Sequence, residues 1–176
     1  MQKIVIIGGP GTGKTSIIEE LSKQGYLCMP EISRQVTKTA RKNGIEQLFL
    51  KDPLLFSKLL LEGRINQYKI ASHKKTDYVF FDRGIPDVHA YLNYMALKYP
   101  DIYVKESLKN LYDAVFIMPP WKDIYINDEE RYESFEQSLA IHNHLYNTYT
   151  SIGYKPIEVP IGKVKQRVAF ILKKIS

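Results

Sequence analysis

Eight consecutive residues near the start of the chain form a phosphate-binding loop. They are Gly8, Gly9, Pro10, Gly11, Thr12, Gly13, Lys14 and Thr15, and they match G-x-x-x-x-G-K-[ST] at every fixed position. Glycines at this spacing let consecutive backbone N–H groups curl around a β-phosphate. Lys14 then reaches the β- and γ-phosphates, and the Thr15 hydroxyl binds Mg²⁺. These residues predict binding of a nucleoside triphosphate with magnesium.

The residues on either side of the loop have the local structure that it requires. Residues 4–7 are an unbroken apolar run, as in a strand buried on both faces of a parallel sheet. Residues 16–23 have the apolar spacing of a helix. The alternative, a glycine-rich turn with an incidental lysine, does not require a strand before it and a helix after it. We therefore expect Ser16, at the start of that helix, to join residues 8–15 in binding the nucleotide.

Asp82 is the second residue suited to magnesium. It ends the apolar run 79–81, which is the Walker B arrangement, in which a carboxylate at the end of a strand holds Mg²⁺ directly or through water. Thr15 and Asp82 are therefore the predicted metal ligands. The alternative is that Asp82 caps the next helix, although Pro86 and Asp87 already suit the first turn of that helix.

Composition indicates one domain, residues 1–176, because 44% of the chain is hydrophobic and no linker or internal repeat interrupts it. The first strand follows Met1 directly, and no apolar run reaches the roughly 18 residues of a membrane span. We therefore expect a cytoplasmic protein without a signal peptide or membrane span. A nucleotide explains the net charge of +6 as well as nucleic acid would, and the basic residues are mostly dispersed, which makes nucleic-acid binding a remote third choice. The one basic cluster is expected to be the solvated face of a terminal helix: Lys163, Lys165, Arg167, Lys173 and Lys174.

Strand and helix patterns alternate along the chain. Further strands are predicted at 26–29, 78–81, 114–118 and 154–159, and further helices at 33–42, 53–73 with an interruption at Gly63, 86–98, 102–111, 133–151 and 163–175. This order predicts an α/β fold of the P-loop NTPase type, with a parallel sheet of about five strands covered by helices on both faces. Ligands of such sheets bind at the carboxyl ends of the strands. The phosphate-binding loop, Glu31, Asp82, Trp121 and the turn 160–162 should therefore converge on one site.

Several motifs together resemble one family, the NadR-type P-loop domain, which is grouped with the AAA-like ATPases. The motifs are residues 8–15, Glu31-x-x-Arg34, 81–87, 119–121, Asp128-x-Glu130-Arg131 and 153–160, and they span nearly the whole chain. The resemblance implies a P-loop kinase fold and, for NadR itself, phosphorylation of nicotinamide riboside. Most relatives resemble ATPases of undefined role, so the fold transfers more safely than the substrate.

Two charged residues resemble residues that have defined roles in small-molecule kinases. Asp82-Arg83-Gly84 resembles the Asp-Arg-x motif of thymidylate and deoxynucleoside kinases, whose arginine meets the acceptor or the transferred phosphate. Glu31 is similar to the acidic residue that accepts the proton of the attacking hydroxyl in the deoxynucleoside kinases. The alternatives are an exposed surface arginine and a glutamate favoured by the N-terminus of the helix 33–42.

A polar segment of about residues 119–133 is the predicted lid. It contains Lys122 and Arg131, which can close over the phosphates and offset the charge that spreads over the transferred group. In the alternative, the segment is an ordinary loop in which Arg131 pairs with Glu130 or Glu129. Trp121 either stacks on an aromatic acceptor or packs in the core.

Two functions fit these residues. The first is transfer of the γ-phosphoryl group of ATP to a hydroxyl of a nucleoside-like small molecule, with Lys14, Glu31, Asp82, Arg83 and Arg131 as the catalytic residues. The second is a regulatory ATPase or GTPase whose output is a conformational change. The kinase is favoured because Arg83, Glu31 and the lid converge as acceptor machinery, which a switch protein does not need. ATP is favoured over GTP because no Asn-Lys-x-Asp guanine signature follows a strand, and the turn 160–162 is expected to pack against adenine.

Overall fold

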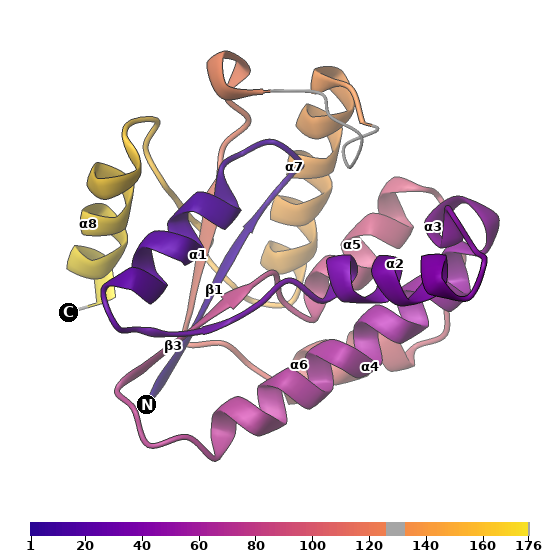
Figure 1. Ribbon diagram of the computed structural model, residues 1–176, viewed down its shortest axis with the longest axis horizontal. Coiled ribbons are helices and arrows are strands. Elements are labelled where there is room, and N and C mark those ends of the chain that lie inside the picture. The colour runs from indigo at the N-terminus through magenta and orange to yellow at the C-terminus, as the bar shows by residue number, and fades with distance from the viewer. Residues whose placement is uncertain (126–132, 176) are drawn as a thin grey trace.

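Five parallel strands form one sheet in the order β2-β3-β1-β4-β5, as predicted (Figure 1). The computed structural model describes residues 1–125 and 133–175. The strands are β1 (Gln2–Gly8), β2 (Leu27–Met29), β3 (Tyr78–Asp82), β4 (Ala114–Met118) and β5 (Ile157–Glu158). Since β1 lies at the centre, the loop that leaves its carboxyl end is flanked by the ends of β3 and β4.

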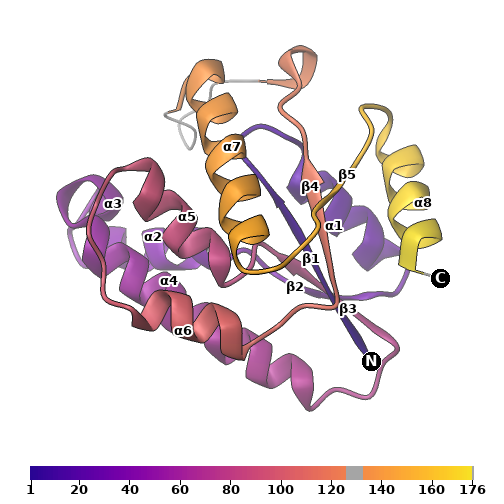
Figure 2. The same ribbon diagram turned by 180° about the vertical axis from the view of Figure 1, so that it is seen from behind.

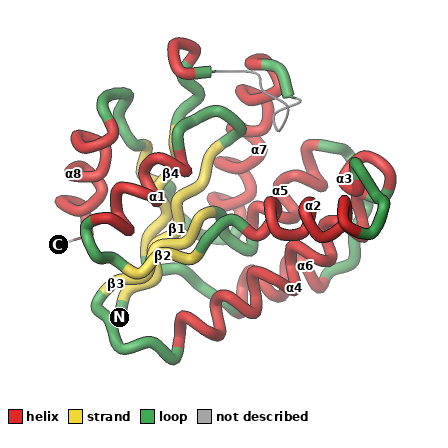
Figure 3. Tube along the Cα trace, viewed as in Figure 1, coloured by secondary structure: helices red, strands yellow, loops and turns green. Residues whose placement is uncertain are grey.

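Helices cover both faces of this sheet (Figures 1 and 2). One face carries α1 (Lys14–Lys23) and α8 (Val164–Ile175), and the other carries α4 (Pro53–Ser72), α5 (Pro86–Tyr94) and α7 (Phe135–Ser151). Beside α4 and α5 lie α2 (Ile32–Lys42), α3 (Leu48–Lys51) and α6 (Ile102–Lys109), all to one side of the sheet in Figure 3. A short 3₁₀ helix, η1 (Lys122–Ile124), follows β4.

The apolar run of β1 is buried on both faces because the sheet is a middle layer. Ile4 and Ile6 pack against α1 and α8, whereas Val5 and Ile7 pack against the opposite helices, and all four are fully buried. Burying each such side chain contributes roughly 1.5–3 kcal/mol. This packing fixes the base from which the phosphate-binding loop starts.

Four elements differ from the predictions by more than one or two residues at an end. Helix α4 continues through Gly63, where a methyl group would lie 2.7 Å from Ile32 Cγ2, so the glycine permits close packing of α2 rather than a break. Helix α5 ends at Tyr94, four residues early, because Ala96 has a left-handed φ of 54°. Strand β5 is shorter than predicted, and α3 was not predicted. Within the described ranges, no helix combines the length and apolarity needed to cross a membrane.

Candidate active site

The phosphate-binding loop connects β1 to the N-terminus of α1. Gly11 and Gly13 have φ values of 72° and 84°, a left-handed conformation that glycine adopts without strain. Lys14 is buried at the start of α1, and its Nζ donates to the carbonyl oxygens of Gly8 (2.9 Å) and Gly9 (2.7 Å). Burial and the nearby Arg83 lower the pKa of Lys14 to about 7. The loop thus gathers a buried lysine and the positive end of a helix at one place.

Two helices brace this loop from outside. Ser138 of α7 donates from Oγ to the carbonyl oxygen of Pro10 (3.0 Å). Arg167 of α8 donates from Nη1 and Nη2 to the carbonyl oxygen of Thr12 (3.2 Å each). Residues 138 and 167 are far from the loop in sequence, and no motif marks them. Ser138 was therefore not predicted to contact the loop. The prediction that Arg167 lies on a solvated face is wrong, because only 2% of Arg167 is exposed.

Asp82 ends β3 beside this loop and is almost fully buried. It does not cap α5, whose N-cap residue is Ile85. Its Oδ1 atom is buried and has no hydrogen-bond partner among the described residues, and burial raises the pKa of the carboxyl group. The charge of Asp82 also interacts with Lys14, the first residue of α1. An unpartnered carboxylate oxygen at this place fits Mg²⁺, which is commonly held by one or two protein oxygens together with phosphates. The described residues contain no group of three or more His, Cys, Asp and Glu side chains that could hold a metal without such help.

The side chain of Arg83 is only 11% exposed, so it is not an exposed surface arginine. Its backbone has a left-handed φ of 72°, a conformation that costs a non-glycine residue roughly 1–3 kcal/mol. Its Nε donates to Glu31 Oε1 (3.0 Å), and its Nη1 donates to the Gly8 carbonyl oxygen (3.3 Å) and the Tyr91 hydroxyl (3.2 Å). The strained backbone thus aims the guanidinium group at the start of the phosphate-binding loop.

Buried polar side chains hold the turn that contains Arg83. The Gly84 N–H and the Tyr149 hydroxyl both donate to Asp87 Oδ2, at 3.0 and 2.6 Å. Arg64 Nη1 donates to the Gly84 carbonyl oxygen (2.7 Å), and the Ile85 N–H donates to the Tyr112 hydroxyl (3.1 Å). Of these supporting side chains only Asp87 belongs to a quoted motif, and the other three come from distant helices and loops.

Glu31 is the N-cap residue of α2, but its side chain does not cap the helix. Oε1 accepts hydrogen bonds from the Ser33 hydroxyl (2.6 Å) and from Arg83, and Oε2 accepts one from Arg34 Nε (3.1 Å). Burial alone would raise the pKa of Glu31, but the Arg83 guanidinium and the Ser33 hydroxyl outweigh burial and lower it to about 2. Glu31 is therefore an ionised carboxylate held against Arg83.

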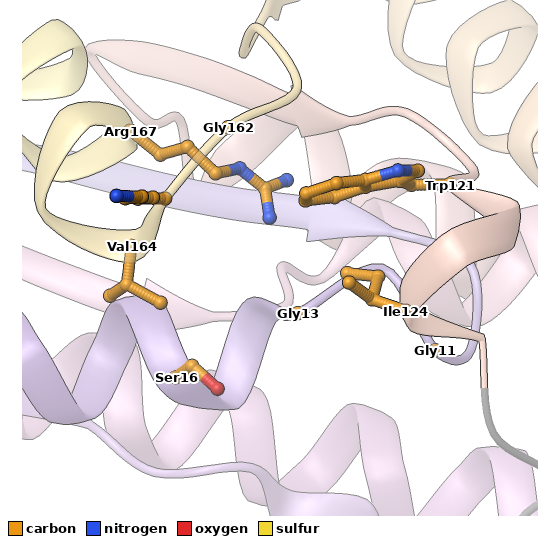
Figure 4. Close-up of a pocket in the computed structure, with 9 residues that line it drawn as sticks. Gly11, Gly13, Ser16, Trp121, Ile124, Gly162, Val164 and Arg167 are labelled. Atoms are coloured by element: carbon orange, nitrogen blue, oxygen red, sulfur yellow. The ribbon is translucent and has the colours of Figure 1, made fainter.

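A cavity of about 320 Å³ lies on the other side of the phosphate-binding loop. Figure 4 shows Trp121 and Arg167 reaching toward one another across it. The residues that line it are Gly11, Gly13, Ser16, Trp121, Ile124, Gly162, Lys163, Val164 and Arg167. Neither Glu31 nor Arg83 is among them, so Trp121 shares a cavity with the turn 160–162 rather than with the expected acceptor residues. Arg131 and the rest of 126–132 lie outside the described residues, so the segment predicted to be a lid is described only up to residue 125 and from 133.

Solved structures with this fold include several kinases. Deoxyadenosine kinase from M. mycoides, with products dCMP and dCDP bound, has a TM-score of 0.71 and 19% identity over 99% of this chain and 98% of that chain. Thymidylate kinase from Ehrlichia chaffeensis has a TM-score of 0.67 and 15% identity over 99% and 98% of the two chains. NadR in complex with NR has a TM-score of 0.74 and 16% identity, and this chain spans 48% of the NadR chain. At these identities the likeness shows the fold alone.

The match to a family model assigns the chain to a family, which solved structures this distant in sequence do not. No curated protein sequence matches the chain. A family described as "AAA domain" matches residues 3–167, which include both the phosphate-binding loop and Asp82. With the NadR structures among the fold relatives, this match confirms the expected resemblance to NadR-type P-loop domains. The chain therefore belongs to this AAA domain family and has the fold of a P-loop kinase.

Proposed function

We propose that this protein is a magnesium-dependent phosphotransferase that moves the γ-phosphoryl group of ATP to a hydroxyl of a nucleoside-like small molecule. The observation that carries the proposal is the Glu31–Arg83 ion pair beside the phosphate-binding loop. Its N–O distance is 3.0 Å, and Arg83 also contacts the Gly8 carbonyl oxygen. An anionic and a cationic group are thus available where an acceptor would approach the γ-phosphate, and hydrolysis alone does not require this pair.

Each predicted catalytic residue has a defined task in this proposal. The N–H groups of the loop and Lys14 bind the phosphates, and Arg83 turns toward the transferred group or the acceptor. Glu31 orients the acceptor hydroxyl. Thr15 and Asp82 would hold Mg²⁺, which would neutralise negative charge on the phosphates. Arg131, outside the described residues, is the proposed lid cation.

Fold relatives support the acceptor class. The deoxyadenosine and thymidylate kinases act on a nucleoside and a nucleotide, and NadR was solved with NR. In this chain the phosphate-binding loop leaves the carboxyl end of the central strand β1, and ligands of such sheets bind at that edge. These structures make nucleosides the first acceptors to test, and membership of the AAA domain family keeps a second candidate, a regulatory ATPase or GTPase.

One experiment separates the two functions. ADP release is measured with ATP and Mg²⁺ alone and then with a panel of nucleosides that includes deoxyadenosine, thymidine and nicotinamide riboside. A kinase hydrolyses ATP slowly until an acceptor completes the site, so a suitable nucleoside should raise the rate by orders of magnitude. Stimulation by a protein partner or a lipid surface, with none by any nucleoside, would favour the regulatory NTPase.

A further inference from the structure

Arg167 is a buried cation that touches the phosphate-binding loop. It lies in the first turn of α8, is 2% exposed, and points from that helix toward the loop and Trp121 (Figure 4). Lys165, two residues earlier on the same helix, is exposed. The guanidinium group donates from Nη1 and Nη2 to the Thr12 carbonyl oxygen, and Nη2 also contacts Met118 Sδ at 3.6 Å.

Among the described residues, no carboxylate compensates the charge of Arg167. Across residues 1–125 and 133–175, its guanidinium group forms no ion pair, and its Nε has no hydrogen-bond partner. Burial lowers the pKa of Arg167, and no anion in the part of the chain that the structure describes opposes that effect. A buried charge without a partner costs stability. Folding therefore does not explain why this position holds an arginine, whereas an anionic ligand on the adjacent loop does.

The hydrogen bonds to Thr12 act on one peptide group of the loop. The carbonyl of Thr12 and the N–H of Gly13 belong to the same planar trans peptide, so they point in opposite directions. By holding the carbonyl, Arg167 fixes the direction of the Gly13 N–H. A cation bound to the carbonyl oxygen also polarises the peptide, which makes its N–H a stronger donor. That N–H is among the first of α1, which have no acceptor within the helix.

We propose that Arg167 is a positioning residue of the donor site, which orients and polarises the Thr12–Gly13 peptide so that the Gly13 N–H binds the phosphate chain of the nucleotide. The identity of the anion as a nucleoside triphosphate rests on the proposed function. Arg167 acts through the loop, so its contribution depends on phosphates and not on the base, although its side chain also lines the cavity next to Trp121.

Calorimetric titration with ATP and with inorganic tripolyphosphate separates phosphate binding from base binding. Arg167→Met should weaken both ligands by about 10-fold, the order of one charge-assisted hydrogen bond. Arg167→Lys keeps the charge and should recover part of the loss for both. Lys165→Met removes one positive charge from the exposed face of the same helix and should leave both affinities unchanged.

Turnover and unfolding measurements exclude a merely structural role. In the acceptor-stimulated assay, Arg167→Met should raise the KM for ATP about 10-fold with kcat within about twofold, whereas loss of folded protein lowers kcat alone. Its thermal midpoint without ligand should not fall below that of Arg167→Lys, because methionine removes a buried unpaired charge.

Three results would overturn the proposal. They are wild-type affinity for both ligands in Arg167→Met, a loss confined to ATP, and a loss that Lys165→Met reproduces. Absence of ATP binding by the wild-type protein would overturn the proposed function together with this inference. ATP binding that depends on Arg167, with no nucleoside stimulating turnover, would overturn the acceptor assignment and support the role of Arg167.

Discussion

The ion pair between Glu31 and Arg83 allows a quantitative test of the acceptor site. Its two side chains are 16% and 11% exposed, so water screens their interaction only weakly. The pKa of Glu31 falls from 4.5 to about 2, which corresponds to about 3 kcal/mol of preference for the ionised carboxylate in the folded protein. Glu31→Gln should therefore lower the free energy of unfolding near pH 7 by up to about 3 kcal/mol.

The pH dependence of this loss has a definite sign. A carboxylate whose pKa is lower in the folded state stabilises the fold fully above its unfolded value of 4.5, and this stabilisation disappears as pH falls toward 2. The difference between wild type and Glu31→Gln should thus be constant from pH 7 to about pH 5 and shrink below that. Urea unfolding at a series of pH values measures it.

A double-mutant cycle assigns the effect to Arg83. Arg83→Met and Glu31→Gln should be non-additive by about 1–3 kcal/mol, and each should abolish acceptor-stimulated ADP release. Arg34→Met is the matched control: Arg34 also pairs with Glu31, but its side chain is 55% exposed, so it should cost less than about 1 kcal/mol. Additive losses would refute the coupling, and stimulation that survives in both variants would show that the acceptor site lies elsewhere.

Three other changes test separate parts of the molecule. Lys14→Ala should weaken ATP binding by at least about 2 kcal/mol, roughly 30-fold, in a folded protein, and calorimetric titration would expose a wrong assignment of the loop if affinity stayed at the wild-type level. Asp82→Asn keeps the shape but loses the charge that would hold Mg²⁺, so steady-state turnover should fall at least about 100-fold, about 2.7 kcal/mol, and a change of only a few-fold contradicts this role. Burial lowers the pKa of His89 from 6.5 to about 4, so the unfolded chain binds a proton between these values that the folded protein does not. Stability should fall by about 2 kcal/mol from pH 7 to pH 5 in the wild type and less in His89→Gln, and equal slopes in urea unfolding would rule out His89 as the cause.

The parts of the fold that the sequence predicted well are encoded locally. Each strand is a short apolar run between turn residues, and α7 begins one residue after Ser134, which forms a capping box with Gln137 in the first turn of the helix. The errors arise where contact with an element distant in the sequence determines the local structure. Gly63 looked like a helix break because glycine is a poor helix former, yet its function is to admit Ile32 of α2. Nothing in the local pattern predicts the left-handed Ala96 that ends α5.

The same distinction applies to the site. Glu31 and Asp82 were identified because both follow strands, and parallel strands bring their carboxyl ends together. Arg167 was misplaced because it is 155 residues from Thr12 in sequence, and the other basic residues of α8 are exposed lysines. A helical pattern with four basic positions does not show which one turns inward. Tyr149 and Arg64 were missed for a similar reason. Apolar spacing was enough to predict the helices on which they lie, and it does not show that their polar groups support the Arg83 turn.

The charge arrangement also limits what Glu31 can do in catalysis. A general base works best with a pKa near the operating pH, and a carboxylate with a pKa of about 2 is a weak proton acceptor. Arg83 is the main cause of that low value, and Arg83 is also the group that would turn to the transferred phosphate. Contact with phosphate would draw the guanidinium away from Glu31 and raise the pKa of this carboxyl group, since the opposing effect of burial remains. Because phosphoryl transfer proceeds through a loose transition state, the proton need not leave early. We infer that Glu31, while it is paired with Arg83, orients the acceptor hydroxyl. It becomes a better base only when the acceptor and the phosphate are both bound.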